Sequence, residues 1–287
     1  MNKKSAALLS IFSNSFLIIF KLISGILMGS ISVLSEAIHS GLDLVASIIA
    51  FISIKQSMKP KDEEHPFGHG KFENVSGFVE AILIFIAAGI IIVEASKKLI
   101  GGVQIESLNA GIIVMLISSL INLCISMLLF KIAKKEDSIA LEADAMHLLT
   151  DVFTSFGVFL GLIVIKITGI QIIDPIIAIV VATMIIKASI DLTKKSLIDL
   201  VDTSLPPEDL NKIKELLSSH PRIKSFHKLR TRKSGATREI DFHICVDEEI
   251  SIFDAHSISH EVKEEIEKEL LGGYVTVHIE PECEKES

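Results

Sequence analysis

Long apolar runs dominate the first two thirds of the chain, and short polar segments separate them. A helix needs about 20 apolar residues to cross the hydrocarbon layer of a bilayer. Six runs of this kind lie at residues 7–29, 31–54, 74–99, 108–131, 140–166 and 172–193. The pattern therefore predicts an all-α transmembrane domain of six helices over residues 1–204, surrounded by the lipid bilayer.

The pattern becomes shorter and more polar after Ser204. Two prolines open an amphipathic helix, and period-two alternation on either side of a Ser-Gly pair is typical of a hairpin. The expected order is helix, strand, strand, helix, strand, at about 206–219, 223–233, 237–246, 253–271 and 274–279. This αββαβ order predicts a cytosolic, ferredoxin-like α+β domain over residues 205–287.

Composition and charge agree with a membrane protein that handles cations. The chain is 49% hydrophobic, has a mean hydropathy of +0.53 and carries a formal net charge of -8. It lacks the basic surface that a phosphate backbone requires, so we expect no nucleic-acid partner. Lysines gather on the side that holds both ends of the six-span domain: Lys3, Lys4, the Lys55 to Lys71 loop, Lys131, Lys134, Lys135, Lys194 and Lys195. Since positive charge marks the inner face, we expect a multi-pass cell-membrane protein with both termini in the cytoplasm.

Two of the apolar runs contain the same ionisable pattern. His39 and Asp43 stand four residues apart in the second run, as do His147 and Asp151 in the fifth. This spacing puts each pair on one helix face, and ionisable groups in a membrane normally face a partner or a cavity. Either pair alone could simply bond to a neighbouring helix. Together they offer two nitrogens and two oxygens, a tetrahedral set suited to zinc, with cadmium, cobalt, iron and manganese as alternatives.

Two further clusters contain metal-binding side chains. Asp62, His65 and His69 lie in the loop before the third run, beside glycines that can turn the backbone around an ion. A peripheral metal site and an ordinary solvated loop both fit this pattern. The predicted cytosolic domain holds five histidines, His227, His243, His256, His260 and His278, with Asp241 and Glu280 near them in sequence. A metal site and ordinary surface histidines are again both compatible with it.

Several of these features together resemble the cation diffusion facilitator family, over nearly the whole chain. The six spans, the two His-x-x-x-Asp pairs and the terminal domain carry part of the likeness. Its most specific part is the loop His-Pro-Phe-Gly-His-Gly-Lys-Phe-Glu at residues 65–73, and the run Leu-Arg-Thr-Arg-Lys-Ser-Gly at 229–235 resembles bacterial members. The nearest type is bacterial ferrous-iron and zinc efflux.

The resemblance implies a homodimeric divalent cation/proton antiporter with a metallochaperone-like cytosolic domain. It implies Zn²⁺ as substrate and as regulatory ion, and no organic cofactor. The positions that match the family's sites are His39, Asp43, His147 and Asp151 for transport, Asp62, His65 and His69 in the loop, and His227, His243, His256, His278 and Glu280 in the cytosolic domain. Lys71 and Asp202 correspond to a charge pair proposed to lock the dimer. Some members have Asp at the position of His39, and with His there the chain resembles the members regarded as zinc-preferring.

Two other classes of function compete with a secondary active transporter. A membrane metalloenzyme would use the same ligands, but the chain has no H-E-x-x-H motif, and four protein ligands would leave no open metal position. A membrane-anchored metal sensor or scaffold without transport is the second rival. An anchor has no need of buried ionisable groups, so the intramembrane pairs favour transport over it.

Overall fold

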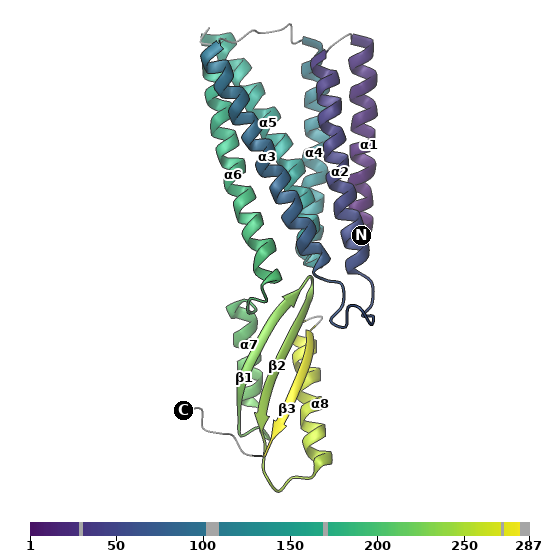
Figure 1. Ribbon diagram of the computed structural model, residues 1–287, viewed down its shortest axis with the longest axis vertical. Helices are drawn as coiled ribbons and strands as arrows, with labels where there is room; N and C mark the ends of the chain where they lie inside the picture. The colour runs from purple at the N-terminus through teal and green to yellow at the C-terminus, as the bar shows by residue number, and fades with distance from the viewer. Residues whose placement is uncertain (29–30, 102–108, 169–171, 271–272, 282–287) are drawn as a thin grey trace. The chain divides into compact units, whose positions relative to one another are not determined.

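The computed structural model describes residues 1–28, 31–101, 109–168, 172–270 and 273–281 (Figure 1). Internal contacts divide the chain into two compact units, Met1–Leu197 and Ile198–Ser287. Each unit has buried hydrophobic clusters of its own. The predicted domain boundary at residues 204 and 205 falls between the last helix of the first unit and the first helix of the second.

In the first unit, the described residues form six long helices at the positions of the six apolar runs. They are α1 (Lys3–Met28), α2 (Ile31–Ser57), α3 (Phe72–Gly101), α4 (Asn109–Glu136), α5 (Ile139–Thr168) and α6 (Ile173–Leu200). The predicted elements are thus confirmed. Among the described residues, α1, α3, α4 and α6 contain segments long and apolar enough to cross a membrane. The other two helices, α2 and α5, carry the ionisable pairs.

Helix α1 shows how the unit distributes its side chains. One stripe, at spacings of three and four residues, is exposed and apolar: Phe12, Phe16, Ile19, Ile23 and Ile26. The opposite stripe is buried and largely polar, with Ser10, Asn14 and Lys21. Because lipid tails cannot satisfy polar groups, such groups must turn inward in a membrane helix. The apolar exterior and polar interior therefore suit a bilayer and create room for an internal site.

Close helix contacts and one buried carboxylate hold the helices together. A Cβ added at Gly77 on α3 would lie 2.8 Å from Ser196 Oγ on α6, so only glycine allows this approach. Glu73, fully buried at the start of α3, accepts hydrogen bonds from Lys3 Nζ at 2.6 Å and Ser57 Oγ at 2.7 Å, and from Ser138 Oγ. Glu73 thus ties α3 to the ends of α1 and α2 and to the residue before α5.

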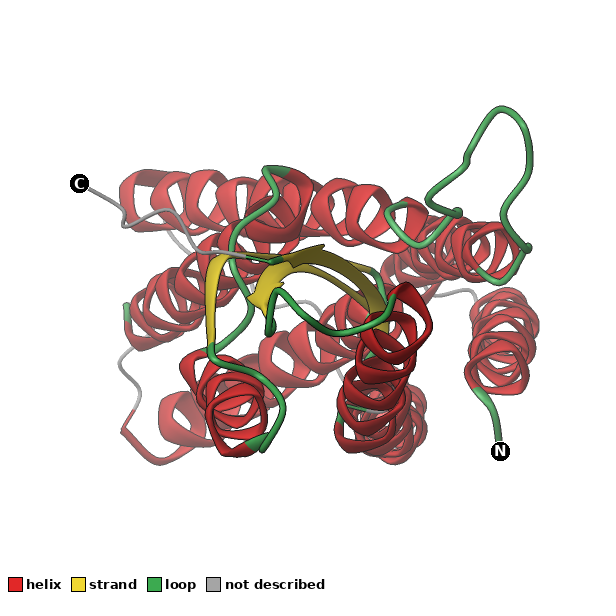
Figure 2. Ribbon diagram, turned by 90° about the horizontal axis from the view of Figure 1, so that it is seen from below, coloured by secondary structure: helices red, strands yellow, loops and turns green. Residues whose placement is uncertain are grey.

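The second unit has the predicted αββαβ order. Its elements are α7 (Pro207–Ser219), β1 (Ser225–Ser234), β2 (Thr237–Cys245), α8 (Ile252–Glu269) and β3 (Gly273–Glu280). The strands form one curved sheet in the order β1-β2-β3, antiparallel and then parallel (Figure 2). Ile240, Phe242 and Ile244 alternate along β2 and join the buried side chains of α7 and α8 in one core. Both helices therefore cover one sheet face, and the residues between, such as His243, belong to the other.

Candidate metal centres

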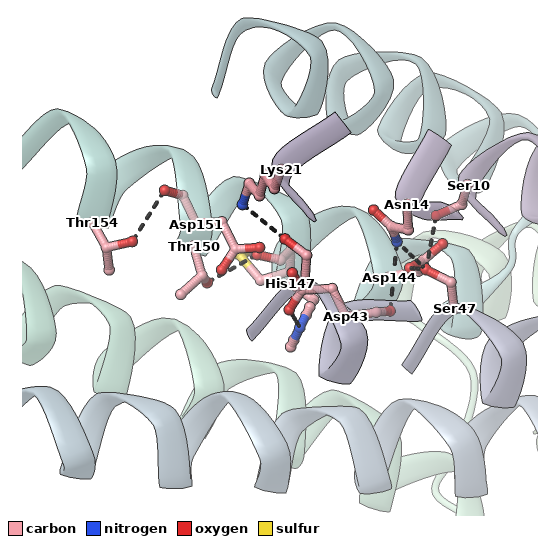
Figure 3. A network of polar contacts seen from close by, with 12 residues as sticks. Ser10, Asn14, Lys21, Asp43, Ser47, Asp144, His147, Thr150, Asp151 and Thr154 are labelled. Atoms are coloured by element: carbon pink, nitrogen blue, oxygen red, sulfur yellow. Dashed lines mark hydrogen bonds and ion pairs between the residues drawn. The ribbon is translucent and has the colours of Figure 1, made fainter. Parts of the chain in front are cut away.

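The intramembrane centre joins α2 to α5. His147 Nε2 lies 3.1 Å from Asp43 Oδ1, and ligand atoms of Asp43, His147 and Asp151 all lie within 4.8 Å of one another (Figure 3). His147 and Asp151 share a face of α5 because they are one turn apart, and Asp43 reaches them from α2. Asp43 is 3% exposed and His147 9%. Asp43 and His147 are thus buried, and Asp151 is partly exposed beside them.

The fourth predicted ligand, His39, lies one helical turn before Asp43 on α2. Its side chain lies outside the described part of the structure. The structure therefore brings together three of the four predicted residues. The chemistry of these three fits a divalent cation as substrate, because borderline metals accept both imidazole nitrogen and carboxylate oxygen. His147 Nδ1 is buried without a hydrogen-bond partner, so the imidazole is not committed to another donor or acceptor on that side.

A buried lysine beside this centre was missed by the sequence reasoning. Lys21 on α1 is 6% exposed, and its Nζ donates to Ser40 Oγ at 2.7 Å. Ser40 precedes Asp43 by three residues on α2, so this bond brings Lys21 into the neighbourhood of the centre (Figure 3). The available signal was a single lysine inside the apolar run Leu17-Ile18-Ile19-Phe20-Lys21-Leu22, since a charge in a span normally has a function. Lys21 thus adds a buried amine to the polar groups around the centre.

The loop centre lies in the segment between α2 and α3. Asp62 Oδ1 lies 3.3 Å from His65 Nδ1, and Asp62 Oδ2 lies 3.3 Å from His69 Nε2. The backbone N–H of His65 donates to Asp62 Oδ1 at 2.7 Å and lowers the pKa of that carboxyl. Gly68, with φ of 90°, makes the turn that carries His69 back towards Asp62. All three predicted loop residues are thus brought together.

The cytosolic centre is a row of three histidines across the open face of the sheet. His243 on β2 is the register partner of His227 on β1 and of His278 on β3. The ring centroids of His227 and His243 are 5.1 Å apart, and those of His243 and His278 are 4.4 Å apart. Cross-strand neighbours on one face point the same way. The sheet register therefore builds the row.

Glu280 joins the row from β3, two residues after His278. Its Oε1 lies 2.7 Å from His243 Nδ1 and 3.5 Å from His278 Nε2, and its Oε2 lies 3.2 Å from His227 Nε2. The hydrogen bond from His243 lowers the pKa of the Glu280 carboxyl. One carboxylate thus faces all three imidazoles, so His227 and the pair His243 and His278 could each share an ion with it.

Cys245 lies next to the histidine row, whereas His256 lies on a helix. Cys245 Sγ lies 3.8 Å from His227 Nδ1, but Cys245 is disulfide-bonded in this structure and so offers no thiolate. His256, predicted as a ligand, lies on α8, where its ring centroid is 5.3 Å from that of His260. Within the described part of one chain, the strand ligands do not gather His256.

The predicted charge pair of Lys71 and Asp202 spans the two units. Lys71 directly precedes α3 in the first unit, whereas Asp202 follows α6 in the second. Within its own unit, Asp202 Oδ2 accepts from Arg232 Nη1 at 3.4 Å. The pair stays a prediction.

Comparison with known proteins agrees with this arrangement of sites. The family model of the cation efflux transmembrane domain matches residues 7–201, and that of the cation efflux protein cytoplasmic domain matches residues 205–282.

Individual relatives match over most of both chains. An uncharacterized transporter of Synechocystis is 34% identical over 88% of this chain and 82% of its own. The cation-efflux pump FieF of Shewanella oneidensis is 29% identical over 97% of this chain and 94% of its own, and protein p34 of Rickettsia prowazekii is 28% identical over 97% and 92%. With both domains matched in order, the chain belongs to the cation diffusion facilitator family of multi-pass membrane cation efflux transporters.

Proposed function

We propose that this transporter exports Zn²⁺ from the cytoplasm in exchange for protons. The observation that carries the proposal is the buried cluster of Asp43, His147 and Asp151 between two helices of the membrane unit. With His39 one turn away on α2, four protein ligands with nitrogen and oxygen donors are available, which suits tetrahedral Zn²⁺. Cd²⁺, Fe²⁺, Co²⁺ and Mn²⁺ accept the same donors and are the competing substrates.

The contact between His147 and Asp43 supports the coupling to protons. A protonated imidazole would donate from Nε2 to Asp43 Oδ1, which lies 3.1 Å away. A metal ion needs the same nitrogen lone pair and the same carboxylate, so metal and proton exclude each other. Small movements of α2 relative to α5 would open the site to one side at a time, as alternating access requires.

The loop and cytosolic centres support a regulatory role for a second class of bound Zn²⁺. Both are more exposed than the intramembrane centre; the side chain of His278, for example, is 61% exposed. We propose that the chain works as a homodimer in the cell membrane with both termini in the cytoplasm. Metal bound by the cytosolic domains would then favour one arrangement of the two copies. The match to a cytoplasmic domain named for cation efflux proteins supports this placement.

The rival proposal is a metal sensor or scaffold that the spans only anchor. It would need the cytosolic centre but not the intramembrane one. The buried position of Asp43 and His147 favours transport, because isolated charges in a membrane interior are costly unless they have a function.

The decisive experiment is Zn²⁺ flux into proteoliposomes driven by a pH gradient. We expect flux with opposite proton movement in the native protein and its collapse in Asp151→Ala. Asp191→Ala, which removes an exposed carboxylate from α6, is the matched control and should transport normally. Flux of one of the competing cations in place of Zn²⁺ would correct the substrate assignment. Absence of flux for all five cations, with metal still bound by the cytosolic domain, would favour the sensor.

A further inference from the structure

A hydrogen-bonded network leads away from the intramembrane centre to Asp144 on α5. Asn14 Nδ2 donates to Ser47 Oγ at 2.7 Å, and Ser10 Oγ lies 3.0 Å from the same hydroxyl. Ser47 Oγ in turn donates to Asp144 Oδ1 at 2.8 Å (Figure 3). Asp144 precedes His147 by three residues, so it lies one turn from the metal ligands on the same helix.

Two carboxyl oxygens at this place are buried without a hydrogen-bond partner. They are Oδ2 of Asp144 and Oε2 of Glu80 on α3, and both residues are fully buried. The other oxygen of Glu80 accepts from Ser76 Oγ at 3.1 Å. The two carboxyl groups interact electrostatically with each other. Their chain neighbours Ala81 and Ala143 belong to one buried cluster, so the helices pack closely here.

Among the described residues, neither unpartnered oxygen has a hydrogen-bond donor beside it. Of the metal ligands, Asp43 from α2 and His147 from α5 interact electrostatically with Asp144. An ionised carboxylate that lies buried with neither a cation nor a donor costs several kcal/mol, and protonation removes this cost. A proton on one of the two carboxyl groups would remove this cost.

We propose that Asp144 and Glu80 form a proton-holding pair beside the transport centre, which gives up a proton when a divalent cation binds there. The inference rests on the proposed antiport and names the group that carries part of the counter-ion. Positive charge at Asp43, His147 and Asp151 would repel a proton held one helical turn away. The carboxyl O–H bond then breaks, the proton passes to water on the side to which the site is open, and the new carboxylate offsets metal charge. Return of the proton from the other side restores the acid.

Infrared difference spectroscopy of the full-length protein in lipid tests the pair directly. A protonated carboxyl group has a C=O stretching band that its carboxylate lacks. We expect Zn²⁺ to remove such a band from the native protein, and Asp144→Asn or Glu80→Gln to abolish that change. Glu142→Gln is the matched control on α5, because Glu142 pairs with Lys195 outside the network, and it should retain the band. A metal-sensitive band that survives in both pair variants would overturn the proposal.

Proton release on metal binding supplies a second readout, measured with a pH indicator in weakly buffered solution. Asp144→Asn should release about one proton fewer per Zn²⁺ than the native protein. If Asp144→Asn does not fold, Glu80→Gln on a different helix makes the same test. Unchanged proton release in both pair variants would refute a proton-holding role. A lower number of bound Zn²⁺ ions in these variants would also refute it, because the pair would then be a metal site. Neither readout needs flux, so failed transport in the native protein would count against antiport alone.

Discussion

The intramembrane and cytosolic centres use similar ligands but are built in different ways. In the membrane, Asp43, His147 and Asp151 converge from two helices; Asp43 and His147 are buried, and Asp151 is partly exposed. In the cytosolic domain, the histidine row is set by strand register and becomes more exposed from His227, with a 12% exposed side chain, to His278 at 61%. A buried centre must exchange charge for charge, because an unbalanced ion there is costly. An open one can follow the metal concentration in water.

The largest effect should come from removing one charge of the buried centre. Asp43→Asn keeps the size of the side chain but removes its negative charge and one of its two oxygens, leaving a neutral amide beside His147. We expect Zn²⁺ flux in proteoliposomes to fall by roughly 100-fold or more, since even groups that only support metal ligands affect function by about 10- to 100-fold. Asp191→Asn makes the same chemical change at an exposed position of α6 and should leave flux within about twofold. Equal losses in both variants would contradict the assigned centre.

A smaller effect is expected when the cytosolic centre loses the carboxylate that its histidines share. Glu280→Ala should weaken Zn²⁺ binding to this centre by about 10- to 100-fold, because Glu280 contacts His227, His243 and His278. Calorimetry on the full chain carrying both Asp151→Ala and Asp62→Ala, which disable the intramembrane and loop centres, would isolate the binding. Asp241→Asn is the control. Asp241 is an exposed residue on β2, the strand of His243, and it lies near Arg230, outside the ligand group. Unchanged affinity in Glu280→Ala would show that the row binds without it.

The same contrast explains what the sequence could and could not predict. The spacing of His147 and Asp151 is local to one helix, so the repeated four-residue pattern was enough to propose the membrane centre. The row of His227, His243 and His278 depends on pairing between strands far apart in sequence. Histidine content and the family likeness indicated that centre, but only the register shows that the three side chains are direct neighbours.

Lys21 was missed, and His256 does not join the row, for the same reason: contacts between different elements cannot be read from local spacing. Lys21 looks like an isolated polar residue within a helix, and its place near the centre emerges only from its contact with Ser40 on α2. His256 was carried over from the family, but it lies on α8, which covers the sheet face opposite the row. Residue type and local spacing therefore sufficed within one helix, whereas partners on other elements had to come from the fold.

The loop centre offers a milder perturbation, because its backbone rather than its ligands can be changed. Gly68 adopts φ of 90°, a backbone conformation that residues with a side chain rarely adopt. Space is not the obstacle there, because an added Cβ would contact Lys61 Cγ at an ordinary 3.6 Å. Gly68→Ala should cost about 1 kcal/mol in the bound loop, or about fivefold in Zn²⁺ affinity of this centre. Gly89→Ala in α3, where a Cβ has open space, should leave that affinity unchanged. An equal affinity in both variants would show that the loop adapts.

The smallest expected effect concerns the stability of the cytosolic domain at acidic pH. Glu249 N–H donates to Asp247 Oδ1 at 3.1 Å and, with Lys224 Nζ at 3.1 Å from Oδ2, lowers the pKa of that carboxyl. The ionised form is thus favoured by folding. Its stabilisation is present above the unfolded pKa of about 3.9 and is lost as the pH falls through the lower folded value.

Asp247→Asn should therefore lower the melting temperature of the cytosolic domain slightly at neutral pH and flatten its decline in acid. Tyr274 on β3 makes this measurable in the full chain, because the sequence has one tyrosine and no tryptophan, so the ultraviolet fluorescence of tyrosine reports this domain alone. Glu248→Gln removes a neighbouring charge and keeps the contacts of Asp247, so its acid limb should match that of the native protein. If Asp247→Asn loses stability in acid as steeply as the native chain, other titratable groups control the acid unfolding of this domain. The residues of the ligand row are then the first groups to test.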